Sequence, residues 1–205
     1  MSDSVFDPDA QQGDVDSKIT AAFERIAQAL RVALWDEGKQ AGLSPVQVQM
    51  LTTLAFRRQG ARIGELAREF SLTPPTISEA VAALESKGLV RRSTHPRDRR
   101  VVTIKLTPAG RTVGRGAIHW ADAIRASLRA VPGEKAVHLA FLMQVIARLQ
   151  QGGLVTIARM CSTCQHFGPA RAGERYVGYC GLLEKPLAQR DLRIDCPEHL
   201  AVEGP

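Results

Sequence analysis

Residues 89–110 read LVRRSTHPRDRRVVTIKLTPAG, in which two runs rich in β-branched residues flank a charged turn. In the second run, Val102, Ile104 and Leu106 alternate with polar positions, which is typical of a half-buried strand. The pattern therefore predicts a β-hairpin with strands over residues 89–94 and 101–106. Its cationic residues are Arg91, Arg92, Arg97, Arg99, Arg100 and Lys105, against the single acidic residue Asp98.

Amphipathic helices are predicted on both sides of the hairpin, because apolar residues recur there every three or four positions. The first should begin near Asp16 or Ser17. Ser44, Thr73 and Thr107 are placed as N-caps, since each is followed by a proline suited to the first helical position. The helices are expected over residues 17–38, 45–58, 63–70, 74–87, 108–131 and 134–151.

The last predicted helix, residues 134–151, is apolar on nearly all of its faces. A helix without a polar face must be buried, and a chain of this size offers few places to bury it. We therefore expect this helix, together with the first and the fifth, to form an interface between two subunits.

A helix, a short turn, a second helix and a basic hairpin are in outline a winged helix-turn-helix, so the predicted fold is mainly α with a small β-hairpin wing. This fold suits DNA, because the major groove admits one α-helix while flanking groups bind phosphates. The wing tip, formed by Arg97, Asp98, Arg99 and Arg100, is suited to a narrow minor groove. With Ile77, Val81 and Leu84 facing the core, the side chains left for DNA are Thr73, Pro75, Thr76, Ser78 and Glu79.

Charge is distributed unevenly along the chain, whose formal net charge is +6. Residues 57–115 contain thirteen Lys or Arg and five Asp or Glu, a local charge of +8. Such a basic segment indicates a polyanionic partner such as double-stranded DNA, the alternative being an ordinary solvated surface. Residues 1–16 carry five Asp and no Lys or Arg, which predicts a disordered acidic arm and is unlike a secretory leader. With no apolar run long enough for a bilayer, we expect a cytoplasmic protein without membrane contact.

Residues 89–110 also resemble the wing signature of the multiple-antibiotic-resistance regulator (MarR) family, and the resemblance extends over residues 17–151. It implies long dimerisation helices, a homodimer, a pseudo-palindromic operator and, usually, repression that a small ligand or an oxidant relieves. The D-x-R element of the family falls on Asp98 and Arg100. The resemblance implies that Arg100 enters the minor groove and that Asp98 steadies the arginines. The alternative is a winged helix that serves as a protein-interaction module.

Residues 152–205 differ in character, because they contain all the cysteines, spaced Cys161-x2-Cys164-x15-Cys180-x15-Cys196. Thiols stay reduced in the cytoplasm, so this clustering favours metal binding over disulfides. The C-x2-C pair places two thiolates within reach of one cation, and the other two cysteines complete a tetrahedral set. A segment this short also has little core of its own. We expect a cysteine-rich metal-binding module, the alternative being free thiols in a loose tail.

The expected centre is either zinc or a [4Fe–4S] cluster. Zinc is the commoner choice for four cysteines, although such sites often use two C-x2-C pairs and only one is present here. The spacing, with Phe167, Tyr179 and Pro197 beside the cysteines, is also similar to the ligand pattern of high-potential iron–sulfur proteins, which implies a cluster. His166 and His199 are alternative zinc ligands.

The expected function is that of a sequence-specific transcriptional regulator, a repressor that responds to a small ligand or to a redox or metal signal. Zinc would brace the fold, whereas a cluster would supply a redox-dependent change of charge. The alternative is a metal- or redox-dependent interaction module that uses the winged domain as a dimer platform. No enzymatic activity is expected, because G-x-S-x-G, H-E-x-x-H and P-loop contexts are absent from the sequence.

Overall fold

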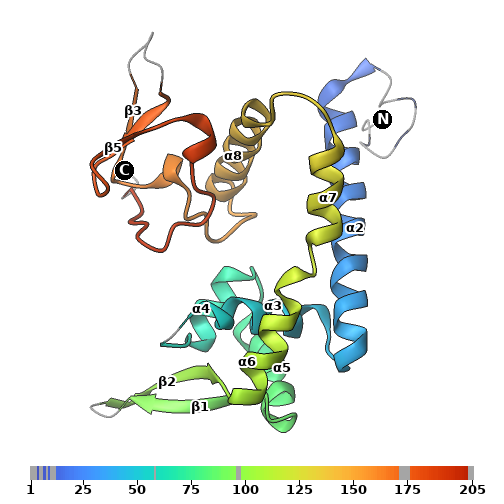
Figure 1. Ribbon diagram of the computed structural model, residues 1–205, viewed down its shortest axis with the longest axis vertical. Helices are drawn as coiled ribbons and strands as arrows, with labels where there is room; N and C mark the ends of the chain where they lie inside the picture. Colours follow the sequence, from blue (N-terminus) through green and yellow to red (C-terminus); the bar gives the residue numbers. More distant parts are fainter. Residues whose placement is uncertain are drawn as a thin grey trace. The chain divides into compact units, whose positions relative to one another are not determined.

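The computed structural model describes residues 4, 7, 9, 13–57, 59–95, 98–170 and 176–202, excluding the side chains of residues 95 and 98–100. The chain divides into two compact units (Figure 1). Unit 1 comprises Met1–Leu66 and Pro74–Val131, and unit 2 comprises Ala67–Thr73 and Pro132–Pro205. This division groups residues 135–151 with the cysteine-rich segment, whereas the sequence-based boundary lies after residue 151. Within the described ranges, no helix is both long and apolar enough to cross a membrane.

Unit 1 is mainly helical and carries an antiparallel β-hairpin. The last residues of helix α4 fall in unit 2. The elements are α2 (Val15–Ala41), α3 (Pro45–Ala55), α4 (Ile63–Glu69), α5 (Pro74–Ser86), β1 (Val90–His95), β2 (Asp98–Leu106), α6 (Pro108–Gly116), the 3-10 helix η1 (Ala117–His119) and α7 (Asp122–Ala130).

Two helices of unit 1 begin at caps that satisfy their first backbone N–H groups. The Asp14 carboxylate accepts hydrogen bonds from the backbone N of Asp16 at 3.2 Å and of Ser17 at 2.8 Å, so α2 begins at Val15. This start lies inside the segment predicted as a disordered arm, of which residues 1–3, 5, 6, 8 and 10–12 lie outside the described residues. Thr107 caps α6 as predicted, because its Oγ1 accepts from the backbone N of Gly110 at 3.0 Å.

The core of unit 1 confirms the predicted inward face of α5. Ile77, Val81 and Leu84 are fully buried. Burying side chains of this size provides the main driving force that holds a short helix in place. The other large buried side chains of the unit are Val48, Met50, Leu51, Leu66 and Ile104.

The predicted hairpin is confirmed as β1 paired antiparallel to β2. The register places Val90 opposite Leu106 and Arg92 opposite Ile104, with an irregularity between Thr94 and His95. Ala61 exchanges two backbone hydrogen bonds with Ile104, at 3.1 and 2.8 Å, and so holds the base of the hairpin. Gly60 permits this approach, since its φ is 77° and an added Cβ would lie 2.3 Å from the Ile104 carbonyl oxygen.

The prediction of one continuous helix over residues 108–131 is wrong, because α6, η1 and α7 divide this stretch. Glycines lower helix stability, and Gly114 and Gly116 precede the break. Gly114 also lies against α3, where an added Cβ would be 2.8 Å from the Leu51 carbonyl oxygen. Close packing on α3 therefore requires glycine at position 114, and the same glycine weakens the helix.

Unit 2 contains α8 (Lys135–Gln151), whose place in an interface between subunits stays a prediction. Met143 is buried and packs with Ala158 and Met160 into a small core. Other apolar residues of the helix remain exposed, namely Val137, Phe141, Leu142 and Leu149. The apolar surface of α8 is thus larger than unit 2 itself covers.

The rest of unit 2 carries short elements that the sequence pattern did not predict. They are η2 (Cys161–Thr163), β3 (Phe167–Pro169), β4 (Gly178–Cys180), β5 (Lys185–Leu187) and η3 (Gln189–Asp191). Strand β4 pairs antiparallel with β3 on one side and with β5 on the other. Strands this short show no detectable alternation, which explains why periodicity missed them.

Candidate nucleic-acid interface and cysteine site

The N-terminal part of α5 presents the side chains that were predicted to read DNA. Pro75, Thr76 and Glu79 are exposed, as is Thr73 just before the helix, while Ser78 is half-buried. The opposite face of the helix holds Ile77 and Val81 in the core. The exposed set is thus small and polar, and lies at the positive end of the helix dipole.

The wing, defined as the β1–β2 hairpin, contains the remaining predicted DNA contacts. Arg97 lies outside the described residues. Asp98, Arg99 and Arg100 lie at the start of β2, and their side chains are outside the described part of the chain as well. The roles that the resemblance implies for Asp98 and Arg100 therefore stay predictions.

Arg92, one of the cations of the wing, is bonded to α5. The Nε of Arg92 donates to Oε2 of Glu85 at 3.2 Å, and the backbone N of Arg92 donates to Oε1 at 3.3 Å. Part of its charge is therefore balanced by Glu85. The contact fixes the base of the wing to the C-terminal end of α5.

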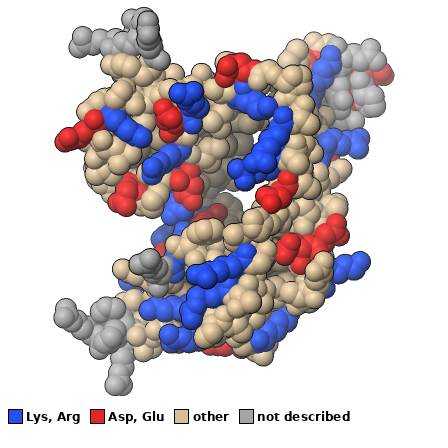
Figure 2. All heavy atoms as spheres, in the orientation of Figure 1, with Lys and Arg blue, Asp and Glu red and all other residues tan. Residues whose placement is uncertain are grey.

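A cationic hollow lies on unit 1, formed by residues distant in sequence. Its lining includes Arg57, Arg91, Lys105, Arg111 and Arg115, and we call this set the basic hollow. The hollow encloses about 470 Å³, and no Asp or Glu belongs to its described lining. Figure 2 shows Lys and Arg side chains gathered over the part of unit 1 that carries the wing and α6. One member is tied to the backbone, because Nη1 of Arg111 donates to the Leu106 carbonyl at 3.1 Å.

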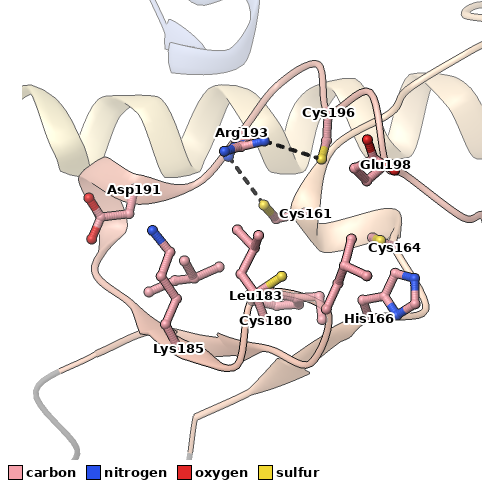
Figure 3. Close-up of a pocket in the computed structure, with 13 residues that line it drawn as sticks. Cys161, Cys164, His166, Cys180, Leu183, Lys185, Asp191, Arg193, Cys196 and Glu198 are labelled. Atoms are coloured by element: carbon pink, nitrogen blue, oxygen red, sulfur yellow. Dashed lines mark hydrogen bonds between the residues drawn. The ribbon is translucent and has the colours of Figure 1, made fainter.

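In unit 2, all four cysteines predicted as metal ligands line one cavity of about 40 Å³ (Figure 3). Cys161 begins η2, Cys164 follows its last residue, Cys180 ends β4, and Cys196 follows η3. All four are free thiols, with Cys164 buried and the others half-buried. The apolar part of the wall consists of Phe167, Leu182, Leu183 and Leu187.

Arg193 provides hydrogen-bond donors to two of these sulfurs. Its backbone N donates to Sγ of Cys161 at 3.2 Å, and its Nη1 donates to Sγ of Cys196 at 3.7 Å. The backbone N of Cys161 donates in turn to the Arg193 carbonyl at 3.0 Å. Sequence spacing gave no indication of this role for Arg193.

The two histidines considered as alternative ligands occupy different places. His166 lines the cavity beside the cysteines. The Nε2 of His199 lies 3.0 Å from Oγ1 and 2.9 Å from the carbonyl oxygen of Thr163, so it forms part of the hydrogen-bonded frame. Across the described chain, no group of three or more His, Cys, Asp or Glu side chains is arranged to hold a metal ion.

The model of the MarR family matches residues 43–102. The transcriptional repressor MdtR of Bacillus subtilis (strain 168) is 25% identical over 95 residues, covering 46% of this chain and 60% of the relative. The structure of the transcriptional regulator PA3341 is 27% identical with a TM-score of 0.57, covering 65% of this chain and 98% of its own. The S. aureus MepR–DNA complex is 22% identical with a TM-score of 0.57, covering 63% and 97%, which shows the fold alone. The chain spans about 60% of the length of the curated relatives that it matches.

The helix-turn-helix of α4 and α5, followed by the antiparallel wing, defines the chain as a winged-helix protein. Over residues 43–102 the chain is similar to the MarR family, and the structural neighbours share its winged helix-turn-helix fold.

Proposed function

We propose that this protein is a sequence-specific DNA-binding transcriptional regulator, a repressor that binds a pseudo-palindromic operator as a homodimer. The observation that carries the proposal is the arrangement of α5, whose apolar face is buried while Thr76 and Glu79 are exposed near its start. A helix presented in this way fits the major groove, where side chains near its N-terminus reach base edges.

The basic hollow supplies a second part of the proposed interface. Phosphate contacts fix the register of a protein on the duplex and provide most of the non-specific affinity. Arg91 and Lys105 extend from the wing, and Arg111 and Arg115 from α6, so the cations surround the base of the wing. We assign to them the sugar–phosphate backbone, and to α5 and Arg100 the bases and the minor groove.

The proposed dimer uses the apolar surfaces that the single chain leaves exposed. On α2, Ile26, Val32 and Trp35 are 51%, 58% and 58% exposed, and on α7 Leu128 is 60% exposed. Apolar side chains of this size are costly to leave in water, and two-fold pairing is the usual way for a self-complementary surface to be covered. A homodimer would also double the basic charge facing DNA.

Trp35→Glu tests the dimer. The acidic side chain should shift the protein from dimer to monomer in analytical ultracentrifugation and weaken operator binding. Phe56→Glu is the matched control for the ultracentrifugation alone, since Phe56 is 77% exposed but follows α3, outside the proposed dimer interface, and its neighbours Ala55 and Arg57 line the basic hollow. A wild-type chain that is monomeric at micromolar concentration contradicts the proposal.

The proposed signal is a small ligand or a change at a metal centre in unit 2. The cavity bordered by Cys161, Cys164, Cys180 and Cys196 supports the second route, because gain or loss of a centre there changes local charge and order. Such a signal acts only if the metal centre changes the relative stability of two states of the protein, one that binds DNA and one that does not.

In vitro selection from random duplexes, followed by fluorescence anisotropy across a range of salt concentrations, tests the DNA-binding function. We expect an inverted repeat bound at least about 10³-fold more tightly than random DNA. Arg111→Ala combined with Arg115→Ala removes two phosphate contacts from each protomer, so it should weaken binding to all sequences and lower the salt slope of the dimer by about four. Arg129→Ala, an exposed arginine on α7, is the control and should leave the slope unchanged. Equal affinity for selected and random DNA would favour the interaction module instead.

A further inference from the structure

We propose that unit 2 binds a [4Fe–4S] cluster through Cys161, Cys164, Cys180 and Cys196, with Arg193 donating hydrogen bonds to two of the ligating sulfurs. The inference rests on the proposed signal response for its biological role. Its chemistry, however, can be tested without DNA.

The backbone frame brings the four cysteines to one cavity without any covalent link between them. In the β3–β4 register, Phe167 lies opposite Cys180. Cys164 forms a bridge with Ala201, and the backbone N of Cys196 donates to the Arg159 carbonyl at 2.9 Å. Three distant segments are therefore fixed around the same space by hydrogen bonds of the main chain.

The arrangement of the four cysteines around one cavity favours a cluster over a single zinc ion. Zinc binds four thiolates at about 2.3 Å in a tetrahedron, which brings neighbouring sulfurs to within about 3.8 Å of each other. No three side chains in the described part of the chain are arranged to hold one ion in this way. Instead the cysteines surround a cavity of about 40 Å³, more than the roughly 10–15 Å³ that a cavity needs to hold one water. A cluster needs more room between its ligands than one ion does, because each of its four irons carries one cysteine sulfur.

The surroundings of the cavity also suit a cluster. Phe167, Leu182, Leu183 and Leu187 give the cavity an apolar wall, and N–H groups point to Cys161 and Cys196. Burial and hydrogen bonds to the sulfurs are the means by which proteins stabilise a cluster and set its potential. The charged residues of the wall balance one another, since Lys185 and Arg193 are matched by Asp191 and Glu198, so the N–H donors of Arg193 are the groups that act directly on the sulfurs.

The chemistry of binding is ligand exchange without oxidation or reduction of the protein. Each cysteine replaces its S–H bond with an S–Fe bond, and the four protons leave to water. The cluster is supplied preassembled, so its irons keep their oxidation states, and the ligands that they carried before are displaced by the four thiolates.

The full chain, purified without oxygen from cells supplied with iron and cysteine, provides the first test. We expect a brown protein with about four irons and four acid-labile sulfides per chain. A colourless protein with one zinc per chain, or one with no metal, overturns the proposal. A brown protein that fails to distinguish operator from random DNA keeps the cluster and removes the DNA-binding function. A colourless protein that still prefers the operator to random DNA keeps the DNA-binding function and removes the cluster.

Variants test the assigned ligands and donor. Cys180→Ala should abolish the iron and sulfide content, whereas Ser162→Ala, an exposed residue inside the C-x2-C pair, should leave it unchanged. If Cys180→Ala fails to fold, the variant Arg193→Lys provides a second test of the cluster site. It preserves the backbone donor to Cys161 but removes the guanidinium from Cys196. We expect loss of the brown absorption in air about 10-fold faster than in the wild type. An unchanged rate contradicts the role assigned to Arg193.

Discussion

Glu85 on α5 holds Arg92 on the wing, with 3.2 Å between Oε2 and Nε and a second bond from the backbone N of Arg92 at 3.3 Å. The pair joins the helix proposed to read the major groove to the hairpin proposed to enter the minor groove. Both side chains are about 40% exposed, so the bond contributes little to global stability. Its effect is to fix the angle between α5 and the wing.

Glu85→Gln should therefore alter recognition more than folding. We expect the free energy of unfolding to change by less than about 1 kcal/mol. The ratio of operator to random affinity should fall by about tenfold, or about 1.4 kcal/mol, because the wing loses its fixed direction and a negative charge leaves the DNA-facing side. Anisotropy with both duplexes measures the ratio. Glu24→Gln, which removes a similar pair with Arg31 on α2, is the control, and an equal loss of specificity in both variants would refute this role.

Arg100→Ala should weaken operator binding while leaving the fold and the dimer intact. An arginine in a narrow minor groove gains from the strong negative potential there, so its loss should cost about 1–3 kcal/mol, mostly at A·T-rich positions. Titrations with operators altered at those positions measure the effect. Unchanged affinity over a range of salt would remove the wing tip from the mechanism.

Gly110 and Gly116 lie on the same helix, α6, and should respond oppositely to alanine. A Cβ at Gly110 would lie 1.8 Å from the Leu89 carbonyl oxygen, so Gly110→Ala should destabilise unit 1 by about 3 kcal/mol or more. Gly116 has helical angles and open space around it, so Gly116→Ala should stabilise by about 0.5–1 kcal/mol. Urea denaturation followed by circular dichroism measures both. Similar effects of the two substitutions would contradict the packing of α6 on the base of the wing.

Asp14 gives the start of α2 a dependence on acidity. A hydrogen bond from the Ser17 side chain, followed by the backbone N–H groups of Ser17 and Asp16, holds the pKa of Asp14 below its ordinary value of 3.8. The ionised form is favoured in the folded state, so the cap stabilises the helix above pH 3.8 and is lost as the pH falls through the lowered pKa. Ser17→Ala should raise this pKa, and ¹³C NMR titration of the carboxyl measures it. Thr20→Ala is the control, since Thr20 bonds to the Asp16 carbonyl, and a pKa unmoved in the Ser17 variant would contradict the assignment.

Local patterns predicted the parts of the fold that neighbouring residues determine. The buried face of α5, the Thr107 cap and the alternation in β2 each depend on residues within one element. The break after α6 could not be predicted in this way, because it depends on Gly114 packing against Leu51 of another helix. What covers the exposed apolar surface of α8 could not be derived in this way either, since sequence does not show what a helix packs against.

The same distinction, between features set by neighbouring residues and features set by residues distant in sequence, applies to the candidate sites. Spacing identified the four cysteines, but the donors of Arg193 follow from a loop that returns to η2. The basic hollow was visible only as a high local charge, because Arg57, Lys105 and Arg115 belong to separate elements that meet after folding.

The backbone hydrogen bonds around η2 also determine the order in which parts of the chain can fold during synthesis. Backbone bonds join Gln165 to Leu200 at 2.8 Å and Val202 to Thr163 at 3.2 Å. A ribosome must therefore have released residue 202 before the C-x2-C loop can close. The N-terminal helices of unit 1 emerge earlier and can fold first, so insertion of any inorganic group would follow the synthesis of both the winged domain and residue 202.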